Sequence, residues 1–521
     1  GRLASEVAQI TLDGEDGVTL GGNLTTSDDA SNAVSITGPV TLGTGITIDT
    51  DHTNNDGTVT FETSGTTING SQTLTITSGG GNVALQGVIG TTGTGIGNLA
   101  INSAGGTGRI EIAGIGDSGN VGVTGTVNIG NSATTRLTLD GTAYFTAGAT
   151  DYEASSGGDG ILITGASPTI TTVDDALSFS TADITFNAAG TTTIDTNNSV
   201  VSAAVAAGNI TIAGAMDATS GEAENVVINS GTGTLSVQGI IGGDQAVANL
   251  TIGSDGSSGA IDVLQIGDGS GAGATGDVAI GGTSTGTLTF DGTIYKSTGS
   301  QTYTAATGGQ NIVVASTGSG AAVTFTTAND NIAFNTSGVI LQNDTTTTIN
   351  TGSGGGTVSF GALLEAGAGN NDSLVIASGT GDVTFTGNIG TSNELGGLDV
   401  NAATAGTGDI TFTGNIGVSG GQSGVFGTTA IGGTTTENVH FNSTYYGFDG
   451  GTTTIVATND SGLGDDENIE LGANSTVTFK AAGEALSFNT SKIDLSNGAD
   501  LSIDSTGGAI TIAGIAGTSA E

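Results

Sequence analysis

Short triplets of an apolar, a polar and a second apolar residue recur along the chain at a nearly constant interval. In the first part of the chain, these triplets begin at Ile10, Val34, Val59, Val83, Ile110 and Leu137. The interval fits the periods of solenoid proteins, in which one repeat forms one coil. Alternation with a period of two residues is typical of a strand with one buried face, and Val and Ile favour strands. Each triplet therefore predicts a strand, and each interval predicts one coil.

The triplets continue through the rest of the chain. They begin at Ile161, Ile184, Ile210, Leu235, Ile261, Leu288, Ile312, Ile332, Val358, Val383, Ile410, Val439 and Ile469. Further short alternating triplets lie between them, and clusters of Gly, Asn, Asp, Ser and Thr separate the triplets, as expected for turns. The pattern predicts an all-β fold, a β-solenoid (parallel β-helix) of about 25-residue coils.

A longer echo of 151 residues overlies the shorter period. Residues 136–144 return as residues 287–295 and again as residues 438–446, so that Leu139, Phe290 and Phe441 are separated by 151 residues each time. We predict long repeats of six coils at 1–151, 152–302 and 303–453, with a partial repeat at 454–521. Without a linker between the copies, residues 1–521 are expected to form one continuous solenoid.

Composition agrees with a thin core. Hydrophobic residues make up 35% of the chain and Gly accounts for 96 of its 521 residues, which suits coils that each bury one inward row of side chains. The 6 basic and 49 acidic residues give a net charge of −43, which opposes binding to nucleic acid and to anionic membranes. No segment approaches 18 consecutive apolar residues, so we expect no membrane insertion.

One acidic turn is a candidate calcium site. The step from Val439 to Ile469 is longer than the others, and it predicts an inserted loop that contains Asp465, Asp466, Glu467 and Asn468. Calcium takes six to eight oxygen ligands, which carboxylates and amides can supply. A solvated turn explains the same residues, and no EF-hand spacing supports calcium.

The sequence predicts no catalytic residue and no bound cofactor. Polysaccharide hydrolases need paired carboxylates in a cleft, and lyases commonly need a cation beside their acids. The six cationic residues are scattered at Arg2, Arg109, Arg136, Lys296, Lys480 and Lys492. His52 and His440 lack neighbours at the spacing of zinc ligands or of a nucleophile and its base, so we expect isolated surface histidines.

Two segments carry a resemblance to a known class. Residues 381–390, Gly-Asp-Val-Thr-Phe-Thr-Gly-Asn-Ile-Gly, return one coil later as Gly-Asp-Ile-Thr-Phe-Thr-Gly-Asn-Ile-Gly at residues 408–417. In this texture the chain resembles the β-strand repeat class of giant secreted bacterial proteins, and is similar to filamentous haemagglutinin-type adhesins and autotransporter passenger domains. The resemblance implies a secreted or cell-surface protein.

Three functions follow as hypotheses. The first is a structural extracellular protein, a rod-like subunit or segment of a filament, sheath or matrix that self-associates end to end or laterally. The second is an adhesin that binds glycans or host surfaces, for which residues 445–468 are the expected ligand-bearing stretch. The third is a carbohydrate-active β-helix enzyme.

Overall fold

The computed structural model describes most of the chain. The described residues are 8–62, 67–91, 93, 95–157, 160–187, 190–197, 207–221, 224–254, 256–271, 273–316, 321–342, 345–369, 371–402, 406–458, 469–472, 474–496 and 498–517. The chain divides into two compact units, residues 1–259 and 260–521, and each is described by itself. Every regular element among the described residues is a strand. These residues form no helix that is long and apolar enough to cross a membrane.

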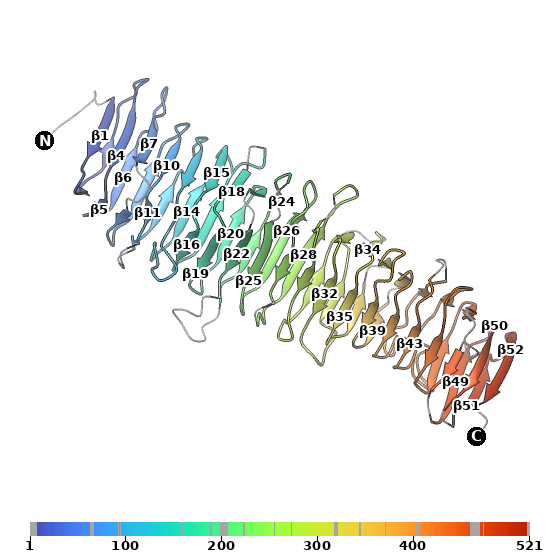
Figure 1. The fold of residues 1–521 in the computed structure, drawn as a ribbon. Coiled ribbons are helices and arrows are strands. Elements are labelled where there is room, and N and C mark those ends of the chain that lie inside the picture. The colour runs from blue at the N-terminus through green and yellow to red at the C-terminus, as the bar shows by residue number, and fades with distance from the viewer. Residues whose placement is uncertain are drawn as a thin grey trace. The chain divides into compact units, whose positions relative to one another are not determined.

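Unit 1 is built from three stacks of parallel strands, which correspond to three sides of the coil (Figure 1). The first stack contains β1 (Gln9–Asp13), β4 (Ala33–Thr37), β7 (Thr58–Glu62), β10 (Val83–Leu85), β13 (Ile110–Ile112), β15 (Arg136–Leu139), β18 (Gly160–Ile163), β21 (Ile184–Phe186) and β24 (Met216–Ala218). The second contains β2 (Val18–Leu20), β5 (Val40–Leu42), β8 (Thr67–Asn69), β11 (Val88–Ile89), β16 (Ala143–Thr146), β19 (Thr169–Thr172), β22 (Gly190–Asp195), β25 (Glu224–Asn229) and β27 (Leu250–Ile252). The third contains β3 (Leu24–Thr25), β6 (Ile46–Asp49), β9 (Leu74–Thr77), β12 (Leu99–Ile101), β14 (Val127–Gly130), β17 (Thr150–Glu153), β20 (Leu177–Ser180), β23 (Ile210–Ile212) and β26 (Leu235–Ile241).

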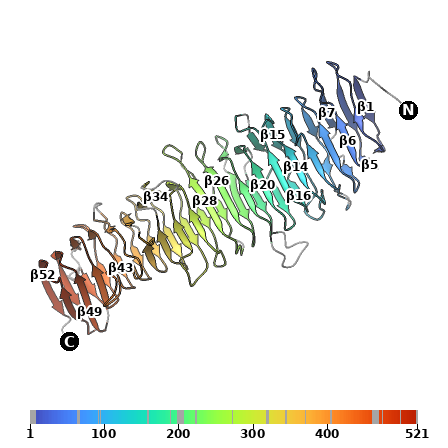
Figure 2. The same ribbon diagram turned by 180° about the vertical axis from the view of Figure 1, so that it is seen from behind.

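Unit 2 has the same plan, as the view from behind also shows (Figure 2). Its first stack contains β28 (Ile261–Ile266), β31 (Ile294–Lys296), β34 (Val323–Thr326), β37 (Thr346–Asn350), β40 (Ser373–Ala377), β42 (Gly397–Val400), β44 (Thr429–Ile431), β47 (Thr453–Ile455), β50 (Leu486–Leu495) and β52 (Ile510–Gly517). The second contains β29 (Val278–Ile280), β32 (Gln301–Thr304), β35 (Ile332–Asn335), β38 (Val358–Phe360), β41 (Val383–Phe385), β43 (Ile410–Phe412), β45 (Val439–Phe441) and β48 (Ile469–Leu471), and it ends on β50. The third runs from β28 through β30 (Leu288–Phe290), β33 (Ile312–Val314), β36 (Val339–Leu341), β39 (Leu364–Ala366), β46 (Tyr445–Phe448) and β49 (Thr476–Ala481) to β51 (Asp500–Asp504).

The fold class predicted from the triplets is confirmed: the protein is an all-β parallel β-solenoid with coils of about 25 residues. The two apolar residues of a triplet are buried and the middle residue is not, as in β41, where Val383 and Phe385 are buried and Thr384 is half-buried. Parallel pairing in register places like residues above one another. Phe385, for example, lies between Phe360 and Phe412 of the neighbouring coils. The continuity of residues 1–521 as one solenoid stays a prediction.

A ladder of stacked phenylalanines runs through the second stack of unit 2. Successive ring centroids from Phe334 through Phe360, Phe385 and Phe412 to Phe441 lie 5.1, 5.3, 5.0 and 5.3 Å apart. The rings are within 9° of parallel because successive coils repeat the same backbone about 4.8 Å apart. The ladder converts a sequence repeat into continuous aromatic packing.

Stacked corners explain part of the glycine content. A Cβ atom at Gly108 would lie 1.9 Å from the carbonyl oxygen of Gly81, and one at Gly81 would lie 2.1 Å from that of Gly57. Corners that approach this closely from coil to coil exclude any side chain. The Gly-rich run at residues 78–81 is therefore a tight corner, as the sequence predicts, closed by a hydrogen bond of 2.8 Å from Gly81 N to Ser78 O.

The 151-residue echo repeats local geometry. The hydroxyl oxygens of Tyr144, Tyr295 and Tyr446, which are all buried, each accept a hydrogen bond of 2.7–2.8 Å from the backbone N–H three residues earlier. The echo nevertheless changes stack within unit 2, because Phe290 belongs to the third stack and Phe441 to the second. Residues one echo apart therefore share a local turn without sharing a side of the coil.

Two of the predicted coil steps are wrong. Ile184 lies in register with Met216 of the next coil, whereas Ile210 belongs to another stack beside Leu177. Likewise Ile312 pairs with Val339 and not with Ile332. Each coil carries up to three similar triplets, so a step of the usual length can lead to a triplet on another side of the coil when a loop lengthens the true coil.

Replacing Phe385 with Ala should lower the free energy of unfolding of unit 2 by about 3–5 kcal/mol, because it removes two ring contacts and leaves a cavity between fixed coils. Urea denaturation followed by circular dichroism measures the change. Thr384→Ala is the matched control, since this neighbouring side chain points outward, and a change within about 0.5 kcal/mol is expected. Equal losses of unfolding free energy in F385A and T384A would contradict a stabilising role of the phenylalanine ladder.

Candidate functional site

The predicted calcium residues Asp465, Asp466, Glu467 and Asn468 lie outside the residues that the structure describes. Calcium binding there stays a prediction. Within the described part of the chain, no group of three or more His, Asp or Glu side chains is arranged to hold a metal ion.

The stretch expected to carry a ligand, residues 445–468, is described as far as residue 458. Its aromatic side chains are covered by the fold: Tyr446 and Phe448 are buried, and Tyr445 is 5% exposed. These rings are therefore held within the fold and are not available to a ligand at the surface.

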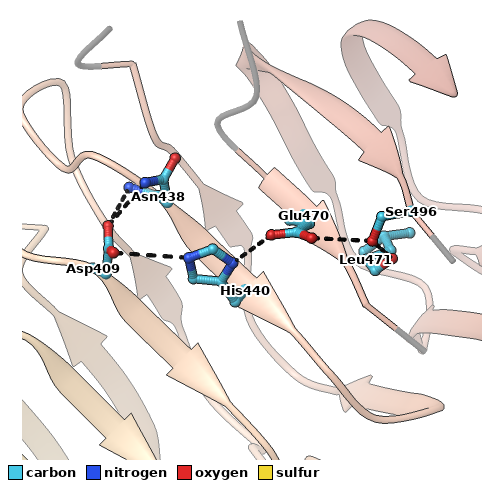
Figure 3. A network of polar contacts seen from close by, with 6 residues as sticks. All are labelled: Asp409, Asn438, His440, Glu470, Leu471 and Ser496. Carbon is cyan, nitrogen blue, oxygen red and sulfur yellow. Dashed lines mark hydrogen bonds and ion pairs between the residues drawn. The ribbon is translucent and has the colours of Figure 1, made fainter. Parts of the chain in front are cut away.

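His440 lies at the centre of a polar network that crosses several coils (Figure 3). It occupies the outward middle position of β45, and parallel pairing places Glu470 of β48 directly beside it. Its Nδ1 atom is 2.8 Å from Glu470 Oε2, and its Nε2 atom is 3.9 Å from Asp409 Oδ2. The prediction of an isolated histidine is wrong, because the partner comes from the next coil and not from a nearby position in the sequence.

The network continues on both sides of the histidine. Asp409 Oδ1 accepts hydrogen bonds from the backbone N–H of Asn438, at 3.1 Å, and from its side-chain amide, at 3.0 Å. Ser496 Oγ donates to Glu470 Oε1 at 3.0 Å. The serine hydroxyl thus contacts the carboxylate and not the imidazole, so the arrangement differs from a nucleophile paired with its base. The imidazole lies between carboxylates of the coils on either side, so the network spans three successive coils.

His52 also has a partner from another coil. Its Nε2 atom lies 3.2 Å from Oγ1 of Thr26, which belongs to the preceding coil. Both histidines therefore contact residues about one coil away.

Two pairs of carboxyl groups lie in adjacent coils at equivalent places in the 151-residue echo. In unit 2, burial, reinforced by the charge of Asp291 and a hydrogen bond to it, raises the pKa of Asp262 to about 6. In unit 1, burial and the charge of Glu111 raise the pKa of Asp140 above its usual value. A raised carboxyl pKa is a property of groups in acid catalysis and also of crowded acidic surfaces.

A hollow of about 480 Å³ on unit 1 lies beside Phe145, between Asp117 and Asp195. Hydrogen bonds from the Asn120 side chain and the backbone of Gly119 lower the pKa of Asp117. Asp117 is therefore an acceptor at neutral pH, whereas a glycosidase acid must carry a proton to donate. The hollow can bind donors or cations through its carboxylates.

Replacing Asp262 with Asn should stabilise the surroundings of β28 and β30 at pH 7. Its pKa of about 6 in the folded protein exceeds the ordinary value of 3.8, so the folded state binds the extra proton between these values. The wild-type free energy of unfolding should therefore fall as pH rises from about 4 to about 6, and the variant should lose this part of the decline.

Hydrogen exchange of the β28 and β30 amides between pH 4 and 7, corrected for intrinsic rates, measures the effect. Asp500→Asn removes one charge from an exposed position of β51 and serves as the control. Parallel pH profiles for wild type and D262N would show that burial of this carboxyl does not cost stability.

Comparison with known proteins gives no relative from which a function could be inferred. No family model, no curated protein and no solved structure matches the chain. The fold is established by the strand pairing alone, and the resemblance to secreted repeat proteins stays an expectation.

Proposed function

We propose that the chain is a structural extracellular protein, a subunit or segment of a cell-surface filament, sheath or matrix. The observation that carries the proposal is the repetition of the fold: in each unit, parallel strands stack in register through successive coils. Inward positions repeat like residues, as in the ladder from Phe334 to Phe441. Such an architecture builds length and repeated outer faces.

The acidic surface makes association between copies of the chain depend on ionic strength. With a net charge of −43, the outer faces of two copies repel one another at low ionic strength. Salt screens this repulsion and should promote lateral association.

Purified protein should form concentration-dependent oligomers that sedimentation velocity and negative-stain microscopy detect. The oligomers should grow as the salt concentration rises, because salt screens the repulsion between acidic faces. A wild-type protein that stays monomeric at millimolar concentration would contradict the proposal of a self-assembling subunit.

A further inference from the structure

One aromatic side chain departs from the rule that aromatic rings pack inside the coils. The chain has 15 phenylalanines and 6 tyrosines, and all of them lie within the described residues. Phe426 is 51% exposed, whereas the other 20 are buried. A single exposed apolar side chain is ordinary by itself, so the surroundings of Phe426 decide what it signifies.

Phe426 lines a hollow of about 250 Å³ on unit 2. Three loops from successive coils form it, and the lining residues are Gly367, Gly369, Asn371, Asn393, Glu394, Gln422 and Phe426. A Cβ atom at Gly450, in the next coil, would lie 3.4 Å from Cε2 of Phe426. The ring therefore has backbone on one side and the hollow on another.

Carboxylates fix the loops that form the hollow. Glu365, which is fully buried, accepts hydrogen bonds from Thr391 Oγ1 at 2.8 Å and from Ser392 N at 2.7 Å. Glu394 Oε1 accepts one from Ser423 N at 2.8 Å, in the following coil. Two of the three loops are thus held by a carboxylate from the coil before them, so this part of the hollow is formed before any ligand binds.

Polar groups remain open to the hollow. Among the described residues, the Asn393 amide and Glu394 Oε2 make no hydrogen bond, and Gln422 uses only its Nε2 atom, 3.3 Å from Ser392 O. The hollow therefore offers amide donors, amide acceptors and a carboxylate beside an aromatic ring.

We propose that this hollow binds one pyranose unit of a neutral glycan, with the apolar face of the sugar against Phe426. Sugar hydroxyls both donate and accept hydrogen bonds, which matches the mixture of Asn393, Glu394 and Gln422. The volume suits a ligand smaller than a typical drug molecule. Because Glu394 lines the hollow and the chain is strongly acidic, uronic and sialic acids are disfavoured.

A second copy of the chain is a poorer occupant. A protein surface that covered Phe426 would also remove water from Asn393, Glu394 and Gln422, and burial of such groups without hydrogen bonds is unfavourable. A sugar brings hydroxyl groups to each of them. The glycan site goes beyond the proposed structural role and does not depend on it.

The test uses the full chain on an array of neutral glucose, mannose, galactose and N-acetylglucosamine oligosaccharides, together with sialylated and uronic acid glycans. Titration of the best neutral oligosaccharide by calorimetry or NMR then gives the dissociation constant. Phe426→Ala should weaken binding at least tenfold and Asn393→Ala by a smaller factor. Val418→Ala is the matched control, because this exposed side chain lies in the same loop as Gln422 but does not line the hollow. The dissociation constant of this variant should be unchanged.

Several outcomes would overturn the proposal: no binding to any neutral glycan, binding to acidic glycans only, or equal affinity of wild type and F426A. Hydrogen exchange of β42 and β44 shows whether each variant keeps the fold. Self-association is measured in parallel, and the proposal requires it to be unchanged in F426A. Loss of self-association instead of glycan binding would assign Phe426 to a contact between copies.

Discussion

Parallel hydrogen bonding between coils is the interaction on which the rest of the structure depends. Inside a stack, each strand lies in register with the strand one coil earlier and the strand one coil later. The backbone, and not the chemistry of the side chain, therefore fixes the two neighbours of each side chain there. Packing at an inward position is therefore most favourable when successive coils carry the same residue there. The ladder from Phe334 to Phe441 and the glycine column at Gly57, Gly81 and Gly108 are two results of this constraint.

The same register brings together polar groups that are distant in the sequence. His440 meets Glu470 and Asp409 because each lies near the same place on consecutive coils. Where adjacent coils bring two carboxyl groups close together, as at Asp262 and Asp291, burial and mutual repulsion raise the pKa of Asp262. Stacking of coils thus creates both attractive and repulsive charge contacts along the outer faces of a solenoid. An acidic chain accumulates repulsive contacts.

Loops are where the fold is free to depart from repetition. Their side chains need not match those of the next coil, so a ring such as that of Phe426 can face solvent without breaking a stack. The carboxylates Glu365 and Glu394 still tie these loops to the coils that follow. Rigid loops on a regular support can hold specific chemistry beside a structural framework.

By itself the sequence determined the type of element and the fold class. Alternation over three residues fixes which side chains of a strand are buried, and runs such as residues 78–81 identify tight corners, because both properties depend on close neighbours. Only the tertiary structure decided which strands are neighbours. Ile184 lies beside Met216 because the length of the intervening loops sets the register, and loop length leaves no periodic signal in the sequence. The partner of His440 and the exposure of Phe426 follow from that register and from loop packing. Such contacts join residues a full coil apart, and local patterns carry no information about them.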